Sequence, residues 1–169
     1  MLFLQNHMVK GEKDMVRFAK EDDLQQVNAI RRQVNDLHVK GRPDIFKSGF
    51  EGEIVETAAA YMQREDCSVV VCEREGKICG FAMLREITRP ENSYMHARRY
   101  LDADEFGVDA SCRRQGVGHE MMQWLRIHAK ERGFDRLELN MWSFNEGALA
   151  FYEQEGFVTY RRYMEIQLN

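Results

Sequence analysis

The chain has 169 residues, of which 44% are hydrophobic and 31% charged, and this length and composition suit one globular domain. Its formal net charge is −4, from 24 basic and 28 acidic residues. That balance disfavours nucleic acid and anionic membranes as partners, and no window approaches the roughly 20 apolar residues of a membrane span. We therefore expect a cytoplasmic protein with no nucleic-acid or membrane partner.

The four cysteines and five histidines lack the spacing of metal ligands. No CxxC pair occurs, and no two histidines stand four residues apart. We expect no metal. Cys67, Cys72 and Cys79 are expected to be reduced thiols that pack in or beside strands.

The first third of the chain predicts a strand and two helices. Residues 1–14 have no clear period and are expected to be an N-terminal extension, followed by a single domain over residues 15–169. A short strand begins at Met15. Apolar residues at steps of three and four from Leu24 to Leu37 predict a helix, with Asp22 or Asp23 as its N-cap and Gly41-Arg42-Pro43-Asp44 at its end. A weaker helix is predicted over residues 52–64.

The middle of the chain predicts three strands in succession. A buried strand over residues 67–73 meets a hairpin turn at Glu75-Gly76, and the returning strand ends before the loop at residues 89–92. The third strand is predicted over residues 99–108. Strands that follow one another directly favour antiparallel pairing.

The last third predicts alternating helices and strands. Apolar residues at steps of four from Val117 to Ala129 predict a long helix that ends at Gly133. A strand over residues 136–142, a helix over residues 145–154 and one or two further strands after Gly156 follow. The fold class is therefore α/β, with a mixed, mostly antiparallel central sheet of six to seven strands flanked by helices.

The segment from Arg113 to Gly118 lies between a predicted strand and the long helix. Its glycines allow close approach of a ligand to the backbone, and the helix start offers unpaired N–H groups at a positive dipole end. The segment therefore predicts an anion site. It matches neither GxxxxGK[ST] nor GxGxxG, so an ATPase and a dinucleotide-binding fold are both disfavoured.

A second motif follows about thirty residues later and comprises Asn145, Ala148, Phe151-Tyr152 and Gly156-Phe157. With Arg113, Gly116 and Gly118 it resembles the two ordered signatures of the GNAT N-acetyltransferase superfamily, R/Q-x-x-G-x-G/A and N-x-x-A-x-x-F-Y-x-x-x-G-F. The resemblance extends over nearly the whole chain from Met15. It implies the GNAT fold, splayed between strands 4 and 5, with acetyl-coenzyme A (acetyl-CoA) as cosubstrate, and a homodimer, since dimers are common in the family.

The resemblance also implies residue roles. Backbone N–H groups of Arg114 to His119 would hold the pyrophosphate, the strand at Phe106 to Val108 would pair with the pantetheine arm, and Asn145 would hydrogen-bond to that arm. The implied cofactor-binding residues are Phe106, Gly107, Val108, Arg113, Arg114, Gln115, Gly116, Val117, Gly118, His119, Asn145 and Tyr152. Phe151 and Phe157 are expected in the core.

Charge near the motif is unevenly distributed. Residues 113–136 hold six Lys or Arg against three acids, whereas Asp102, Asp104, Glu105 and Asp109 contribute four negative charges with no base among them. The first segment suits a polyanionic cofactor, although both also fit ordinary solvated charge.

Transfer to an amine requires a proton acceptor and a proton donor, because a Lys-like amine with a pKa near 10.4 is protonated at neutral pH. Asp102, Asp104 and Glu105 are the candidate bases, with Glu105 and Asp104 placed above Asp102. Strand alternation puts Asp102 and Asp104 on one face and Glu105 on the other, unless Gly107 marks a bulge. Tyr152 occupies the family's tyrosine position for reprotonating the leaving thiolate.

The expected function is N-acetyl transfer from acetyl-CoA to a primary amine of a small molecule or protein, by direct attack in a ternary complex. A covalent route through Cys112 is disfavoured, because no histidine is placed to activate it. The alternative is a non-catalytic acyl-CoA-binding sensor or interaction module of the same fold. The resemblance further implies that residues 38–56 and 88–99 select the acceptor.

Overall fold

The computed structural model describes residues 14–168, and this part of the chain contains nine α-helices and β-strands in the order β α α β β β α β α, besides two single-turn 3-10 helices. The order matches the first nine predicted elements. The expected extension at residues 1–14 lies outside the described residues, except for Asp14, which opens the first strand. The elements are β1 (Asp14–Phe18), α1 (Leu24–Gly41), α2 (Glu53–Met62), β2 (Cys67–Arg74), β3 (Lys77–Arg89), β4 (Arg98–Val108), α3 (Val117–Glu131), β5 (Arg136–Leu139) and α4 (Glu146–Gln154).

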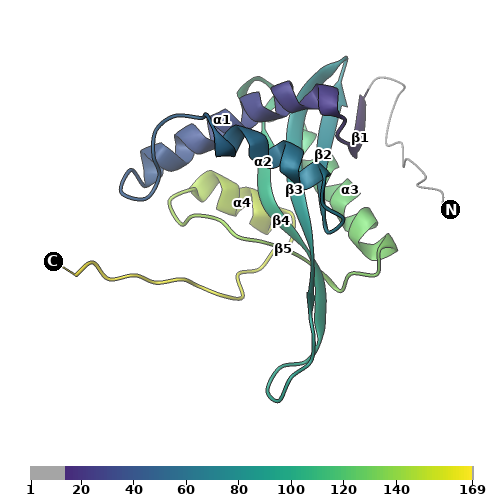
Figure 1. Ribbon diagram of the computed structural model, residues 1–169, viewed down its shortest axis with the longest axis vertical. Coiled ribbons are helices and arrows are strands. Elements are labelled where there is room, and N and C mark those ends of the chain that lie inside the picture. The colour runs from purple at the N-terminus through teal and green to yellow at the C-terminus, as the bar shows by residue number, and fades with distance from the viewer. Residues whose placement is uncertain (1–13, 169) are drawn as a thin grey trace.

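The strands form one mixed sheet in the order β1-β2-β3-β4-β5. The first four pair antiparallel, and β5 lies parallel to β4 after the crossover helix α3 (Figure 1). The expectation of six to seven strands is not met within residues 14–168. Residues 158–168 alternate in the manner of a strand, but they pair with no other strand of the described chain and remain irregular.

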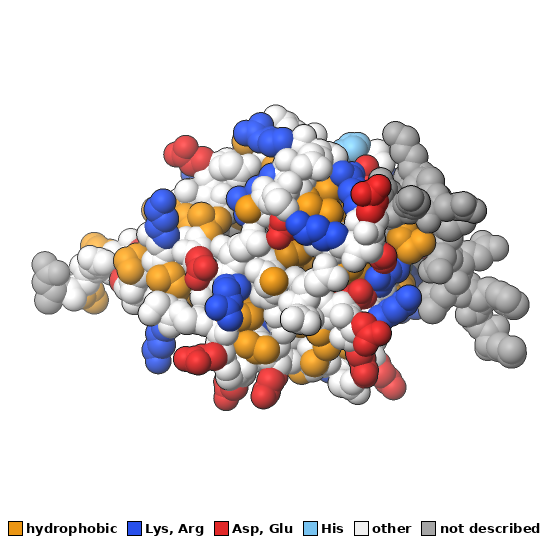
Figure 2. Space-filling view, turned by 90° about the horizontal axis from the view of Figure 1, so that it is seen from above, with side chains coloured by type: hydrophobic (Ala, Val, Ile, Leu, Met, Phe, Trp, Pro, Cys, Tyr) orange, Lys and Arg blue, Asp and Glu red, His pale blue; other side chains and the backbone are white. Residues whose placement is uncertain are grey.

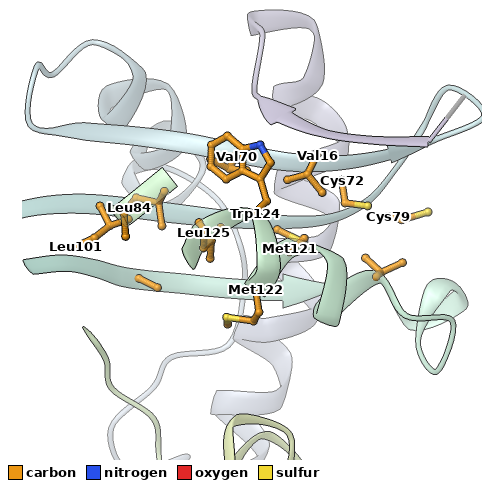
Figure 3. Close-up of a cluster of buried hydrophobic side chains, with 14 of the residues drawn as sticks. Val16, Val70, Cys72, Cys79, Leu84, Leu101, Met121, Met122, Trp124 and Leu125 are labelled. Carbon is orange, nitrogen blue, oxygen red and sulfur yellow. The ribbon is translucent and has the colours of Figure 1, made fainter. Parts of the chain in front are cut away.

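Helices cover both faces of the sheet. Helices α1 and α2 lie on one face, where Val27, Ile30 and Ala58 are buried against β2 and β3. Helix α3 lies on the other face, and Met121, Leu125 and their neighbours point into the strands (Figure 3). Each face of the sheet therefore has its own apolar core, as expected for strands whose side chains alternate between two faces.

Local sequence explains where several elements begin and end. The β2–β3 hairpin turns at Glu75 and Gly76, which both have positive φ, and Gly133 follows α3 with a φ of +69°, as a C-terminal glycine does. Asp23 precedes α1 as predicted, but its carboxylate does not cap the helix. It accepts instead from Arg17 and from the backbone N–H of Lys20.

A β-bulge interrupts the pairing of β3 with β4. Met83 lies opposite Glu105 and Leu84 lies opposite Ala103, so Asp104 is an extra residue with no partner. A bulge of this kind shifts the alternation of side chains by one residue. The bulge therefore lies at Asp104 and not at Gly107, and the faces predicted for the acids of β4 change accordingly.

The β3–β4 hairpin extends past the other strands as an arm, with its turn at residues 90–97 (Figure 1). Seen from above, the surface carries charges of both signs interspersed with hydrophobic side chains (Figure 2). No helix within residues 14–168 has the length and apolar character needed to cross a membrane.

Close approach of α3 to the sheet depends on Gly80 in β3. A Cβ at this position would lie 2.7 Å from Met121 Sδ, 3.0 Å from Val117 Cγ1 and 3.2 Å from the carbonyl oxygen of Gly107. We expect Gly80→Ala to lower the free energy of unfolding by about 1–3 kcal/mol, the usual cost of overpacking. Urea unfolding of the variant and the wild type measures this difference.

Gly147→Ala is the matched control, because a Cβ there meets only Asn145 Oδ1 at 4.0 Å. In helix α4 this change should be neutral or stabilise by up to about 1 kcal/mol. Equal stability of the two variants would contradict the role given to Gly80.

Candidate functional site

The outer edge of β4 is open over its second half. Pairing with β5 extends only from Tyr100 to Ala103, so no strand of the described chain lies on the outer side of Asp104–Val108, the side away from β3. The Nε of Arg113 donates to the carbonyl oxygen of Val108 at 3.1 Å, which indicates that the backbone of Val108 faces this edge. Because antiparallel pairing alternates in steps of two, the backbone of Phe106 faces it as well.

The loop after β4 leads directly to the N-terminus of α3. Gly116 precedes the helix with a φ of +83°, and Arg114 also has positive φ at +62°. The first turn of a helix leaves its N–H groups without intrahelical partners, so those of Val117, Gly118 and His119 are available to an anion. The segment predicted to bind an anion therefore lies at the end of the open edge.

Contacts from β2 and α4 hold this loop. Arg74 donates to the carbonyl oxygen of Gln115 at 3.0 Å and forms an ion pair with Glu120 at 2.9 Å. A Cβ on Gly118 would lie 3.0 Å from the ring of Phe151. Gly118 is thus needed for α4 to approach α3, a packing role that the sequence pattern does not reveal.

An open cavity of about 450 Å³ lies beside the loop, lined by Arg74, Glu75, Lys77, Cys79, Ser111, Cys112 and Gln115. The Sγ atoms of Cys79 and Cys112 are 2.7 Å apart, and both residues are buried. Burial raises the pKa of Cys79 to about 12. Cys112 thus contacts another thiol and not a base that could activate it.

Tyr152 of α4 lies beside the open edge within a group of aromatic rings. Its ring centroid is 6.2 Å from that of Phe106, 5.3 Å from Phe151 and 5.7 Å from Phe157. Burial raises the pKa of Tyr152 to about 12. The phenol therefore stays protonated across the physiological range and can donate a hydrogen bond.

Two other predicted residues take part in holding α4. Asn145 caps this helix, with its Oδ1 accepting from the N–H of Ala148 at 3.1 Å. His119 Nδ1 lies 2.7 Å from a carboxylate oxygen of Glu155, which Arg126 also contacts at 3.2 Å. Both Asn145 and His119 therefore have a structural partner near the site.

The bulge brings the three candidate bases to one face of the sheet. Arg85 donates to Asp102 and Asp104, each at 2.7 Å. Asp104 also accepts from the hydroxyl of Tyr61 in α2, and Glu105 accepts from Arg31 in α1. The expectation that Glu105 faces away from Asp102 and Asp104 is therefore wrong, because the extra residue shifts the alternation.

These acids differ in exposure. The side chains of Asp104 and Glu105 are each 30% exposed, whereas that of Asp102 is 13% exposed. Burial raises the pKa of Asp102, and the hydrogen bond from Arg85 opposes that change. Asp104 and Glu105 are thus the more accessible carboxylates.

The buried Arg31 is central to this face. It contacts both carboxylate oxygens of Glu105, at 2.7 and 2.8 Å, and donates to the carbonyl oxygen of Ile54 at 2.6 Å. It therefore ties α1, β4 and the start of α2 together. The sequence pattern did not single out three residues of this face, because the acids that they contact lie 17 to 74 residues away along the chain. These residues are Arg31, Tyr61 and Arg85.

An aromatic cluster formed by His38, Phe46, Trp142 and Phe144 brings the end of α1 next to the chain after β5. His38 stacks on Phe46 at 4.9 Å, and Trp142 stacks on Phe144 at 6.3 Å. Burial lowers the pKa of His38, although the charge of Glu105 opposes this. His38 is therefore a neutral imidazole near the acidic face.

The second segment expected to select the acceptor, residues 88–99, includes the turn at residues 90–97. This turn lies at the end of β4 opposite to the loop before α3.

The site thus combines an open strand edge, a helix N-terminus at one end of that edge, and carboxylates at the other. Such an arrangement can bind an extended ligand with an anionic end and present its far end to a polar face. Within residues 14–168 no group of three or more His, Cys, Asp or Glu residues could hold a metal ion.

Comparisons with known proteins agree with this geometry. The chain is 31% identical over 101 residues to the uncharacterized N-acetyltransferase MJ1207 of Methanocaldococcus jannaschii. The matched region is 57% of this chain and 41% of that protein. The chain thus spans about two fifths of the length of this relative.

Solved structures share the fold over most of the chain. A mutant of the BH1408 protein from Bacillus halodurans superposes with a TM-score of 0.88 at 28% identity, covering 92% of this chain and 99% of that one. The aminoglycoside N-acetyltransferase AAC(6')-Iy, in complex with CoA, gives a TM-score of 0.72 at 13% identity, covering 95% and 98%. The second likeness concerns the fold alone.

The family is established by the sequence itself. The model of the acetyltransferase (GNAT) family matches residues 32–157, which include α1 from Arg32 onward, the open edge of β4, the loop before α3 and the whole of the second motif. This match confirms the resemblance drawn from the two motifs: the chain belongs to the GNAT acetyltransferase family.

Proposed function

We propose that the protein transfers an acetyl group from acetyl-CoA to a primary amine of a small molecule or protein, by direct attack in a ternary complex. One observation carries the proposal: the open edge of β4 runs from the accessible acids Asp104 and Glu105 to the loop before α3. A donor bound along this edge would place its anionic end at the helix and its acyl end at the acids.

The chain's own groups suit the donor. The N–H groups at the start of α3 would hold the pyrophosphate, and the outward backbone of Phe106 and Val108 would pair with the pantetheine arm as an added strand. Gly116 leaves space at the anion site, where a Cβ would contact only Glu120 at 3.8 Å. The structural relative in complex with CoA supports this ligand class. Bound there, acetyl-CoA supplies an activated acyl group as its thioester.

The acidic face would receive the amine. Asp104 and Glu105 attract the ammonium form and take up its proton directly or through water. Each is held by a partner, Tyr61 and Arg31 respectively, which fixes its position.

Tyr152 would donate a proton to the leaving thiolate. Its pKa of about 12, raised by burial, keeps the phenol protonated, and its ring packs on Phe106 of the open edge. The phenol therefore starts a turnover in the protonated form that the role requires, and after it gives its proton to the thiolate it must take up a proton again before the next turnover. Binding of acetyl-CoA without turnover of any amine would favour the sensor alternative.

Gly116→Asp should weaken acetyl-CoA binding by about tenfold or more, because it adds a negative charge where the pyrophosphate would lie. Calorimetry measures the affinity. Thermal unfolding gives a second readout, since ligand at a hundred times its dissociation constant adds about 2.7 kcal/mol of stability. ATP and NAD serve as ligand controls.

Gly133→Asp is the matched variant for that experiment. It places the same charge at a glycine with positive φ, +69°, at the other end of the same helix, so its backbone strain is comparable. It should bind acetyl-CoA like the wild type. Unchanged binding in Gly116→Asp would remove the proposed pyrophosphate site.

Tyr152→Phe should keep the affinity for acetyl-CoA and lower kcat by about 100-fold or more, the usual contribution of a general acid. A thiol-release assay with an accepted amine measures the rate. Tyr163→Phe, at an exposed position outside the segments expected to select the acceptor, makes the same change away from the site and should leave kcat unchanged. Equal rates in the two variants would exclude Tyr152 as the acid.

The rate should rise with pH from about pH 6 to about pH 9, because the acceptor amine, with a reference pKa near 10.4, becomes increasingly neutral. Tyr152, with a pKa of about 12, remains protonated throughout this range and causes no fall on the alkaline side. A flat profile of kcat/KM against pH would contradict rate-limiting attack by the neutral amine.

A further inference from the structure

Two buried thiols lie next to the loop before α3, and the proposed reaction uses neither of them. Cys79 belongs to β3, and Cys112 ends the single-turn helix η2 (Ala110–Cys112) that follows β4. Their Sγ atoms are 2.7 Å apart, although the residues are 33 positions apart along the chain. That separation is about 0.7 Å longer than the S–S bond of a disulfide. A small movement of the two side chains would therefore bring the sulfurs within bonding distance.

The backbone already holds the two cysteines next to each other. The N–H of Asp109 donates to the carbonyl oxygen of Cys79 at 2.9 Å, and the N–H of Cys112 donates to the carbonyl oxygen of Asp109 at 2.9 Å. The carboxylate of Asp109 accepts in turn from Gln33 of α1 at 3.0 Å. The turn that carries Cys112 is thus docked on β3 at Cys79 itself, so a bond between the thiols fits the backbone arrangement that is already present.

The open cavity beside the loop gives a reagent access to both thiols. Cys79 and Cys112 are only 4% and 6% exposed, but both line this cavity of about 450 Å³ together with Lys77 and Ser111. Cys72 of β2 also lies near Cys79 (Figure 3), yet it is fully buried and does not line the cavity. A reagent in the cavity therefore meets Cys79 and Cys112 but not Cys72.

The charges around the pair indicate which thiol reacts first. Thiol–disulfide exchange proceeds through a thiolate, and burial raises the pKa of Cys79 to about 12, so Cys112 is the first to react. The ammonium of Lys77 donates to Ser111 Oγ, which lies 3.7 Å from Cys112 Sγ. The pKa of Lys77 is raised, first by its hydrogen bond to Asp109 and also by negative charge at the two cysteines. This ammonium and a thiolate in the cavity therefore attract one another.

We propose that Cys79 and Cys112 are a redox-active pair, which a low-molecular-weight disulfide oxidises to an internal disulfide. The Cys112 thiolate attacks one sulfur of the reagent, RSSR, which forms a mixed disulfide and releases RS⁻. The Cys79 thiolate then attacks Sγ of Cys112 and releases the second RS⁻. Each RS⁻ takes up one of the two protons that the cysteines lose, so the pair loses two electrons and RSSR becomes two RSH.

The new bond would fix the turn before the loop of residues 113–116 to β3. It would enclose most of the β3–β4 hairpin, because that hairpin lies between the two cysteines along the chain. A cross-link over a segment of this length restricts the unfolded chain and so stabilises the folded one. The oxidised protein therefore holds this loop more firmly than the reduced protein. The inference does not rest on the proposed acetyl transfer.

Oxidation of the full chain with glutathione disulfide under native conditions tests the pair directly. Mass spectrometry of the digested protein should show the peptide with Cys79 joined to the peptide with Cys112, with the loss of two hydrogen atoms. Dithiothreitol should reverse the bond. If both thiols persist in excess glutathione disulfide, the proposal is wrong. Glutathione that stays attached to Cys112, or a bond between Cys79 and Cys72, would overturn it too.

Thermal unfolding measures the effect of the bond on stability. We expect the melting temperature of the oxidised wild type to exceed that of the reduced wild type by about 5 °C or more. An unchanged or lower melting temperature after oxidation would contradict the role given to the bond.

Three alanine variants separate the pair from the other thiols. Cys112→Ala removes one member of the pair and should abolish the rise in melting temperature on oxidation. Cys67→Ala removes a thiol that contacts Asp66 at 3.6 Å, and Cys72→Ala removes the one that does not line the cavity, so both should keep the full rise. Each variant is compared with its own reduced form, which cancels the effect of the substitution itself. A rise that persists in Cys112→Ala, or that disappears in either of the other variants, would place the bond elsewhere.

Discussion

The β-bulge at Asp104 shifts the pairing of β4 with β3 by one residue, and the candidate site depends on that shift. With Asp104 unpaired, Glu105 turns to the face that already holds Asp102 and Asp104, while Ala103 and Phe106 stay on the opposite face in the core beneath α3. An unbulged strand would send either Glu105 or Phe106 to the wrong side. Pairing of β4 with β5 also ends next to the bulge, because Ala103, the residue before Asp104, is the last one that pairs with β5.

The helix that closes the core also carries the proposed anion site, so packing and the proposed binding share one constraint. The side chains of Val117 and Met121 reach Gly80, which fixes how close the first turn of α3 lies to the sheet. Arg74 then ties the preceding loop to the end of β2, and Gly118 lets Phe151 of α4 approach. Contacts from three other elements, β3, β2 and α4, thereby set the position of the N–H groups at the start of α3.

Periodicity predicted the nine described elements because helices and strands bury side chains at fixed intervals, and the glycine motif predicted where β4 turns into α3. The bulge could not be predicted, since alternation assumes an unbroken pleat and Asp104 has no sequence mark of its own. The ion pair of Arg31 with Glu105 joins residues 74 apart, beyond any local pattern. Residues 158–168 show the opposite failure: the pattern predicted a strand, but within residues 14–168 no other strand pairs with it.

An open strand edge is also a hazard, because exposed backbone N–H and C=O groups invite pairing with strands of other molecules. The free half of β4 begins at Asp104 and Glu105 and is followed by Asp109, which accepts hydrogen bonds from Gln33 and Ser111, and the rings of Phe151 and Tyr152 crowd Phe106 within it. Charge at both ends and aromatic bulk between them hinder a foreign strand from lying flat along this edge. The acids that would serve an incoming amine therefore also protect the empty protein against edge-to-edge aggregation.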